Sequence, residues 1–545
     1  MTANAISSNS RRRFLWLSVA LSVAALIQIF DAWRSPVIAR DGMRFIAIAQ
    51  ELHRPREAFA YFTQHPGYPA CICIVHRALG HLSDGATVGS WVWAARLVSG
   101  VFGLGCIVAV WLLTRGLVGD LAANLAALIF AVLPIARLNA ADALSDSGHL
   151  CFYLLGAWFL CDAVNGRGTW RYFAAGCCSG LAYWIRPEGW SVALVGGLFL
   201  GFELCRSTLL SRRQAWRGLV LLMTATAIVS GPYVLLSGKI TDKVRRKENL
   251  VKFSRHLKQA DAKSPSKETP SAHIEQTGLP LTLGGAASVL AAALAQLFKN
   301  ILETYQALLL PACWALLPNN KFRFPAGPAR VIWGLATLHM LLLVGLFITG
   351  GYISERHLLP ILGLSMPVVG AGLLRLAVDF AIIITLLGKI GTARRGRPWT
   401  LAFFLALMIV TLLPQALRNS HAQFVPDLAA AEWIRQHKRP LDKVITNTPY
   451  PLFYAETSGK CVKQNEDFGR ELAGLANHRV LVIVQRKQKQ PPVATAIAFD
   501  SDNHTTALEF VAQCKFRSKT HEVLVYACEP RIAQTADNAQ RRIQR

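Results

Sequence analysis

Four polar clusters interrupt long apolar stretches of this sequence, and each holds side chains that could do chemistry. The clusters are Asp41, Asp142 with Asp146, Arg186-Pro187-Glu188, and Glu355-Arg356-His357. A carboxylate can orient a hydroxyl group or take its proton, and a guanidinium can hold a phosphate through two parallel hydrogen bonds. These residue types therefore suit the transfer of a group from a phosphate-linked donor to a hydroxyl acceptor.

Asp41 is the candidate base. It precedes Gly42, whose missing side chain lets the backbone pass close to a ligand, and the alternative is an ordinary solvated aspartate in a loop. Further along the same segment, residues 65–69 read His-Pro-Gly-Tyr-Pro and predict a rigid turn. His65 and Tyr68 could line a sugar site there, or the turn could simply precede a helix at the membrane surface.

Asp142 and Asp146 are four residues apart. On one continuous helix they would share a face and could bind a metal ion or an acceptor hydroxyl. The alternative is that Ser145, Asp146 or Ser147 caps the N-terminus of the next helix.

Two arginines are the candidate phosphate ligands. Pro187 fits the first turn of a helix and would direct both Arg186 and Glu188, although these two could also form only a local ion pair. Arg356 is the second candidate, and the alternative is that the segment 355–357 anchors a helix end at the membrane surface.

Apolar segments long enough to cross a bilayer separate these clusters, since a span needs about 20 apolar residues for a hydrocarbon core of roughly 30 Å. The sequence predicts about eleven spans, near residues 14–30, 91–114, 119–137, 148–164, 172–185, 189–205, 218–236, 300–318, 330–350, 357–374 and 399–417. Arginines fill the short loops on one predicted face, as in cytoplasmic loops, and all four polar clusters fall on the other. Charged groups gathered at one membrane face are expected to mark a functional cavity.

Composition supports a membrane protein and argues against several other classes. Apolar residues make up 53% of the chain, so the bilayer is its main solvent. The net charge of +26 comes mainly from basic residues between apolar segments, which suits membrane lipids and not nucleic acid. The sequence has no P-loop, H-E-x-x-H or G-x-S-x-G motif, which argues against nucleotide hydrolysis and zinc proteolysis.

The pattern predicts a mainly α fold, with a polytopic helical bundle over residues 1–417 and a small soluble α/β domain over 418–545. The bundle would carry a first external loop at 34–90 and a basic external loop at 237–299. Residues 376–390 would extend the tenth span or form an interfacial helix, since a further crossing there, the alternative, would put Arg394 and Arg395 outside. In the C-terminal domain we expect helices at 426–437 and 505–513 and strands at 443–446, 479–484, 493–499 and 522–526. Counting crossings places this domain outside an inner (plasma) membrane, where Cys461, Cys514 and Cys528 could include one disulfide.

These residues resemble the GT-C superfamily of integral-membrane glycosyltransferases, particularly bacterial relatives of protein O-mannosyltransferases and of the lipid A aminoarabinose transferase. The shared plan covers nearly the whole chain. It comprises an acid in a large first external loop, a His-Pro-x-Tyr-Pro-like turn, an acidic cluster in the second external loop, and Arg-Pro-Glu and Arg-His-Leu-Leu-Pro motifs, here at Asp41, 65–69, 142–146, 186–188 and 356–360.

The resemblance implies an inverting transfer of a sugar from a polyprenyl-phosphate donor to a lipid, glycan or protein acceptor. It implies that Asp41 is the catalytic base, that Arg186 and Arg356 hold the donor phosphate, and that Asp142 or Asp146 helps to place a substrate. Many O-mannosyltransferases have an Asp-Glu pair where this chain has Asp41 alone, which weakens the case for a protein acceptor. Some relatives use a divalent cation, but these residues do not establish a metal cofactor.

Two other classes compete with this interpretation. A membrane transporter or lipid flippase with a charged external cavity would predict internal repeats and charges near the bilayer midplane, and the sequence has no convincing repeat. A membrane-anchored scaffold or sensor would need neither Asp41 nor the arginines, and its C-terminal domain alone should bind a partner.

Overall fold

The computed structural model describes residues 3–52, 64–80, 87–238, 240, 283–317, 324–350, 352–388, 393–416, 421–462, 479–487, 496–501, 504–518 and 520–528. Contacts divide the chain into two compact units. The first contains Met1–Phe30, Phe45–Arg77 and Ala94–Arg418, and the second contains Asp31–Arg44, Ala78–Trp93 and Asn419–Arg545.

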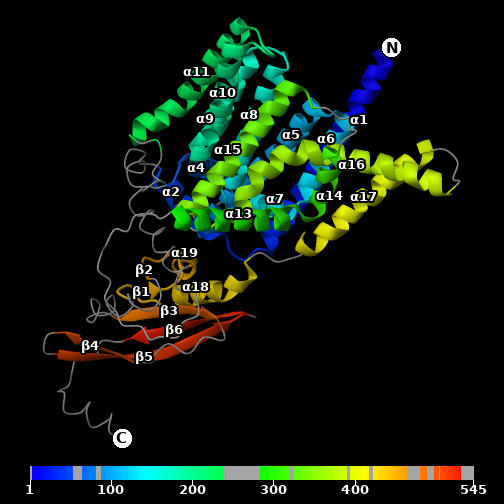
Figure 1. The fold of residues 1–545 in the computed structure, drawn as a ribbon. Coiled ribbons are helices and arrows are strands. Elements are labelled where there is room, and N and C mark those ends of the chain that lie inside the picture. The colour runs from blue at the N-terminus through cyan, green and yellow to red at the C-terminus, as the bar shows by residue number, and fades with distance from the viewer. Residues whose placement is uncertain are drawn as a thin grey trace. The chain divides into compact units, whose positions relative to one another are not determined.

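Helices dominate the part of the chain before residue 417 (Figure 1). Those of the first half are α1 (Ala3–Arg34), α2 (Arg40–Glu51), α4 (Gly67–Gly80), α5 (Val88–Leu117), α6 (Asp120–Val132), α7 (Pro134–Ala141), α8 (Asp146–Val164), α9 (Trp170–Ile185), the 3-10 turn η1 (Pro187–Trp190), α10 (Ser191–Arg206) and α11 (Arg212–Ser237). They are followed by α13 (Leu283–Tyr305), η2 (Gln306–Leu308), α14 (Leu309–Leu316), α15 (Ala326–Gly350), η3 (Glu355–Leu358), α16 (Leu359–Gly388) and α17 (Ala393–Ala416).

The structure supports a polytopic membrane protein, but it does not confirm eleven spans. Among the residues described, seven helices are long and apolar enough to cross a membrane, or eight if the bent pair α6–α7 counts as one span. This pair bends by 60° at Leu133, where Pro134 begins α7, so the expected span 119–137 is broken. The expected span 300–318 is likewise divided among α13, η2 and α14.

Helix α16 runs without interruption from Leu359 to Gly388. Residues 376–388 therefore extend the helix of the tenth expected span, as the sequence indicated. The interior Pro367 does not end the helix.

Small residues allow helices α8 to α11 to pack closely, side by side (Figure 1). A Cβ added to Gly176 of α9 would lie 2.4 Å from the Leu222 carbonyl oxygen of α11. One turn later, a Cβ on Gly180 would lie 2.6 Å from Cβ of Val229. This spacing of small residues is the usual way in which membrane helices approach each other, and it makes α9 and α11 a rigid support for the segment after α9.

The second unit contains a six-stranded sheet in the order β2-β1-β3-β6-β5-β4 (Figure 1). Its elements are η4 (Ala422–Phe424), α18 (Val425–His437), β1 (Lys443–Thr446), α19 (Tyr450–Tyr454), β2 (Lys460–Cys461), β3 (Val480–Lys487), β4 (Ala496–Ser501), β5 (His504–Arg517) and β6 (His521–Cys528). Strand β1 is parallel to β2 and β3, and the remaining pairs are antiparallel. Buried Ala430 and Ile434 of α18 pack on the sheet with Val444, Ile483 and Val525.

The expected helix at 505–513 is wrong. The segment belongs to β5, whose backbone pairs with β4 on one side and with β6 on the other. Residues 504–509 pair with β4 and residues 510–512 with β6, so sheet pairing overrides the local helical pattern. In the same unit, Cys461 and Cys514 are free thiols, and the side chain of Cys528 lies outside the described part.

Candidate active site

Four helix ends of the first unit meet at one polar cluster. Asp146 is the first residue of α8, and Arg186 directly follows α9, which runs in the opposite direction. Glu188 lies in η1 before α10, and His357 lies in η3 before α16. Helices of alternating direction therefore deliver residues that are far apart in sequence to the same place.

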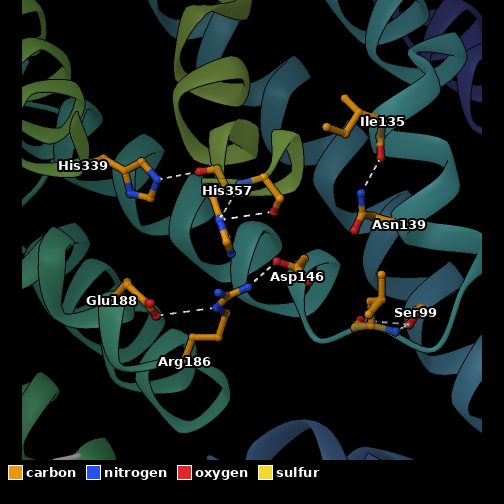
Figure 2. A network of polar contacts seen from close by, with 10 residues as sticks. Ser99, Ile135, Asn139, Asp146, Arg186, Glu188, His339 and His357 are labelled. Atoms are coloured by element: carbon orange, nitrogen blue, oxygen red, sulfur yellow. Dashed lines mark hydrogen bonds and ion pairs between the residues drawn. The ribbon is translucent and has the colours of Figure 1, made fainter. Parts of the chain in front are cut away.

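Arg186 is held between two carboxylates (Figure 2). Its Nη1 donates to Oδ1 of Asp146, and its Nε lies 3.5 Å from Oε2 of Glu188. The side chains of Asp146, Arg186 and Glu188 are 6%, 17% and 28% exposed. A buried ion pair of this kind is costly to break from one side only, so it sets the direction of the guanidinium.

The sequence after α9 forces a tight turn that presents Arg186. The Arg186 N–H still donates to the Ala182 carbonyl, 2.9 Å away, but its backbone is extended and Pro187 then starts η1. Gly189 is required because a Cβ there would lie 2.2 Å from the Tyr183 nitrogen. The Ser179 hydroxyl donates to the Gly189 carbonyl at 2.8 Å, which ties the turn back to α9.

A second turn brings Arg356 and His357 to the cluster. The Ser354 N–H donates to Nδ1 of His357 at 3.2 Å, which closes the turn, and the His357 ring points toward the Asp146–Arg186 pair (Figure 2). Asp146 is subject to the positive charge of both Arg186 and Arg356. The positive charges of two arginine side chains therefore act on one carboxylate, and guanidinium groups of this kind can also bind the oxygens of a phosphate.

The opposite ends of the same helices carry a different set of ion pairs. At the end of α8, Asp162 pairs with Arg167 at 3.0 Å and with Arg171 at 3.2 Å. At the end of α10, the buried Glu203 lies 3.5 Å from Arg330. Arg167, Arg171 and Arg330, which the sequence assigns to cytoplasmic loops, thus lie at the ends away from Arg186.

Asp142 and Asp146 do not share a helical face, which corrects the sequence expectation. Asp142 directly follows α7, and its Oδ1 accepts from the Ala143 N–H at 2.7 Å, whereas Asp146 begins α8. The turn between them breaks the helical spacing on which a shared metal or hydroxyl site depended. The capping alternative also fails for Ser145, whose side chain makes no capping hydrogen bond. Within the described ranges, no three His, Cys, Asp or Glu side chains are grouped to hold a metal ion.

His65 and Tyr68 lie in or beside the first turn of α4 and are packed among helices. His65 Nδ1 is 2.7 Å from the Tyr183 carbonyl, and the fully buried Tyr68 hydroxyl donates to the Ala95 carbonyl at 3.1 Å. Burial raises the pKa of the Tyr68 phenol, which therefore stays neutral. These contacts support the alternative that residues 65–69 form a turn that precedes a helix. The role of His65 and Tyr68 in sugar binding stays a prediction.

Asp41 lies in the second unit, in the first turn of α2. It is half-buried, and Gly42 is also helical, so this part of the expected first external loop forms a helix. Glu355, beside Arg356, is exposed.

Three buried polar residues of the first unit were missed. His149 and Tyr153 lie three and seven residues after Asp146 on α8, and His339 lies in α15. His339 Nε2 is 2.9 Å from the His357 carbonyl oxygen (Figure 2). The available signal was the presence of three ionisable or hydroxyl side chains inside apolar spans, where they are costly and tend to be functional.

The chain is similar to known glycosyltransferases in sequence over one region and in fold over most of its length. The family model of dolichyl-phosphate-mannose-protein mannosyltransferases matches residues 85–230. The structure of ArnT from Cupriavidus metallidurans bound to undecaprenyl phosphate is 15% identical, covers 94% of this chain and 98% of its own, and has a TM-score of 0.57. Apo ArnT from the same organism is 14% identical, covers 95% and 98%, and has a TM-score of 0.56.

An archaeal enzyme has the same fold. The apo oligosaccharyltransferase of Archaeoglobus fulgidus is 13% identical over 87% of this chain and 69% of its own, with a TM-score of 0.55. No curated protein matches the sequence. The family match and these structures confirm the resemblance to the GT-C superfamily, and the chain has the GT-C fold.

Proposed function

We propose that this integral membrane protein is an inverting glycosyltransferase that moves a sugar from a polyprenyl-phosphate donor to a lipid, glycan or protein acceptor on the extracytoplasmic face. The observation that carries the proposal is the gathering of Asp146, Arg186, Glu188, Arg356 and His357 at one end of the bundle, in a fold shared with a transferase bound to undecaprenyl phosphate.

The chemistry is a single displacement. The Asp41 carboxylate takes the proton of the acceptor hydroxyl while the acceptor oxygen bonds to the anomeric carbon of the sugar. The bond between that carbon and the phosphate oxygen breaks, and its electron pair leaves with the polyprenyl phosphate. Arg186 and Arg356 stabilise the negative charge that develops on this phosphate. Attack opposite the leaving group inverts the anomeric configuration.

Phosphate binding at Arg186 must accommodate the two carboxylates that already contact its guanidinium. A guanidinium has five N–H donors, of which the two carboxylates engage the Nη1 and Nε sides. The guanidinium groups of Arg186 and Arg356 together can engage phosphate oxygens. Asp146 and Glu188 then hold the guanidinium in orientation, and Asp142, Glu355 and His357 border the substrates.

Binding of undecaprenyl phosphate to the purified full-length protein tests the phosphate site. Arg186→Gln and Arg356→Gln should each raise the Kd by about 10- to 100-fold, because a hydrogen bond to a charged group contributes about 1.5–3 kcal/mol. Arg167→Gln is the matched control, since Arg167 pairs with Asp162 at the other end of α8 and should leave the Kd unchanged. An equal effect of all three variants would contradict the proposed site.

Transfer itself is tested with Asp41→Asn and by mass spectrometry of cell-envelope glycans, lipids and proteins with and without the protein. The variant should bind undecaprenyl phosphate normally and lose transfer, because an amide cannot take the proton. Full transfer by purified Asp41→Asn would remove Asp41 as the base. Reporters fused after Gly42 and Ser147 should read as external, and a cytoplasmic signal at either would overturn the proposed side of the membrane.

A further inference from the structure

A row of buried polar rings leads from the Asp146–Arg186 pair into the bundle. Asp146, His149 and Tyr153 follow each other on one face of α8, at spacings of three and four residues. Ring centroids are 5.7 Å apart for His149 and Tyr153, and 6.5 Å apart for Tyr153 and His339 of the neighbouring α15. The three rings are 4%, 0% and 5% exposed.

The contact with the His357 carbonyl determines which nitrogen of His339 carries hydrogen. His339 Nε2 is 2.9 Å from that carbonyl oxygen, and a carbonyl can only accept. The hydrogen is therefore on Nε2, and in the neutral ring Nδ1 is left as an acceptor that needs a donor. Tyr153, whose hydroxyl can act as a donor, is the neighbouring ring.

Three polar atoms of this row have no hydrogen-bond partner among the residues that the structure describes: His149 Nε2, Tyr153 Oη and His339 Nδ1. Each would cost about 1–3 kcal/mol if it were left unpaired in the interior. One water can accept from the Tyr153 hydroxyl and donate to both imidazole nitrogens. Three hydrogen bonds are the usual number for a buried water, so a single molecule would satisfy the whole set.

The His339 contact also controls the turn that carries Arg356. The turn has two buried supports from other helices: His339 donates to the His357 carbonyl, and Nδ2 of Asn300 in α13 donates to the Ile353 carbonyl at 2.8 Å. The charge of Arg356 acts on Asp146, so a shift of this turn would move a cation of the site.

We propose that His149, Tyr153 and His339 enclose a binding site for one structural water, and that Tyr153 and His339 are positioning residues that hold the 355–358 turn, and with it Arg356, against the donor phosphate. The water fixes the orientation and tautomer of His339, and His339 fixes the His357 carbonyl. This inference rests on the proposed function, because its readout is the affinity for a polyprenyl phosphate.

The test compares the affinity of full-length variants for undecaprenyl phosphate. His339→Leu should raise the Kd about tenfold, as expected when a buried hydrogen bond at the site is lost. His339→Gln keeps an N–H donor near the position of Nε2 and should stay within about threefold of the natural protein. Tyr153→Phe should raise the Kd by about three- to tenfold. Tyr305→Phe, which removes a buried hydroxyl bonded to Ser365 at 2.9 Å, is the matched control and should leave the Kd unchanged.

Measuring His339→Leu in a protein that already carries Arg356→Gln separates an effect on the position of Arg356 from a general loss of structure. If His339 acts through Arg356, His339→Leu should have almost no further effect on the Kd in an Arg356→Gln protein. If His339→Leu raised the Kd by the same factor with and without Arg356→Gln, the proposal would be overturned. An equal loss of affinity in His339→Gln and His339→Leu would also overturn it. Should the natural protein fail to bind undecaprenyl phosphate at all, the proposed function fails as well. Independently, an experimental map that resolves waters should show one within hydrogen-bond distance of all three atoms, and a dry site would refute the water.

Discussion

The Asp146–Arg186–Glu188 group predicts an asymmetric response to substitution. Arg186→Leu leaves Asp146, only 6% exposed, without its partner, and we expect the free energy of unfolding to fall by about 3–5 kcal/mol. Asp146→Asn is milder because Arg186 keeps Glu188, and the expected loss is about 1–2 kcal/mol. Glu188→Gln should cost less than about 1 kcal/mol, since Glu188 is more exposed and its oxygen is 3.5 Å away.

The double variant gives the sharper result. Asp146→Leu combined with Arg186→Leu removes both buried charges, so it should be more stable than Arg186→Leu alone. The measurement is reversible unfolding of the purified protein in mixed detergent micelles, followed by circular dichroism. Additive losses in the double variant, or equal losses for Arg186→Leu and Asp146→Asn, would refute the idea that Asp146 depends on Arg186 for its burial.

Two further predictions concern the turn after α9 and the C-terminal sheet. Gly189→Ala should lower the unfolding temperature and the affinity for undecaprenyl phosphate, because the added Cβ would lie 2.2–2.3 Å from the backbone of Tyr183 and Ala182. Gly201→Ala in α10 is the control: its Cβ would meet nothing within 4 Å, so this variant should be neutral or slightly stabilising. Equal effects of the two substitutions would contradict the packing argument. Burial raises the pKa of Asp427 from 3.8 to about 7, although Gln485 Nε2 donates to its Oδ2 at 2.9 Å. The folded state therefore holds more protons than the unfolded state between about pH 4 and 7, so stability falls as the pH rises through this window, by up to about 4 kcal/mol. Asp427→Asn should abolish this fall, as measured by hydrogen exchange in β3 and β6 at pH 5.5 and 7.5, and an unchanged pH dependence would show that Asp427 is not its source.

Local patterns in the sequence were sufficient for part of this structure. Long apolar segments predicted most of the helices, and short apolar runs predicted β1, β3 and β6 of the C-terminal unit. The break at Arg186-Pro187 was also visible, because proline at a first helical position marks a helix start wherever it lies. The order of the polar clusters identified the residues around Arg186 and indicated the GT-C resemblance.

The partners of these residues were decided only by the tertiary structure. The sequence suggested Glu188 for Arg186, but not Asp146, which lies forty residues earlier. It placed Asp142 and Asp146 on one face, whereas a turn separates them, and it gave no reason to join Tyr153 with His339. Helical periodicity determines which side chains share a face of one helix. The rotation and crossing of neighbouring helices determine what that face meets, and they depend on close contacts such as those of Gly176 and Gly180, which form only when the whole bundle packs.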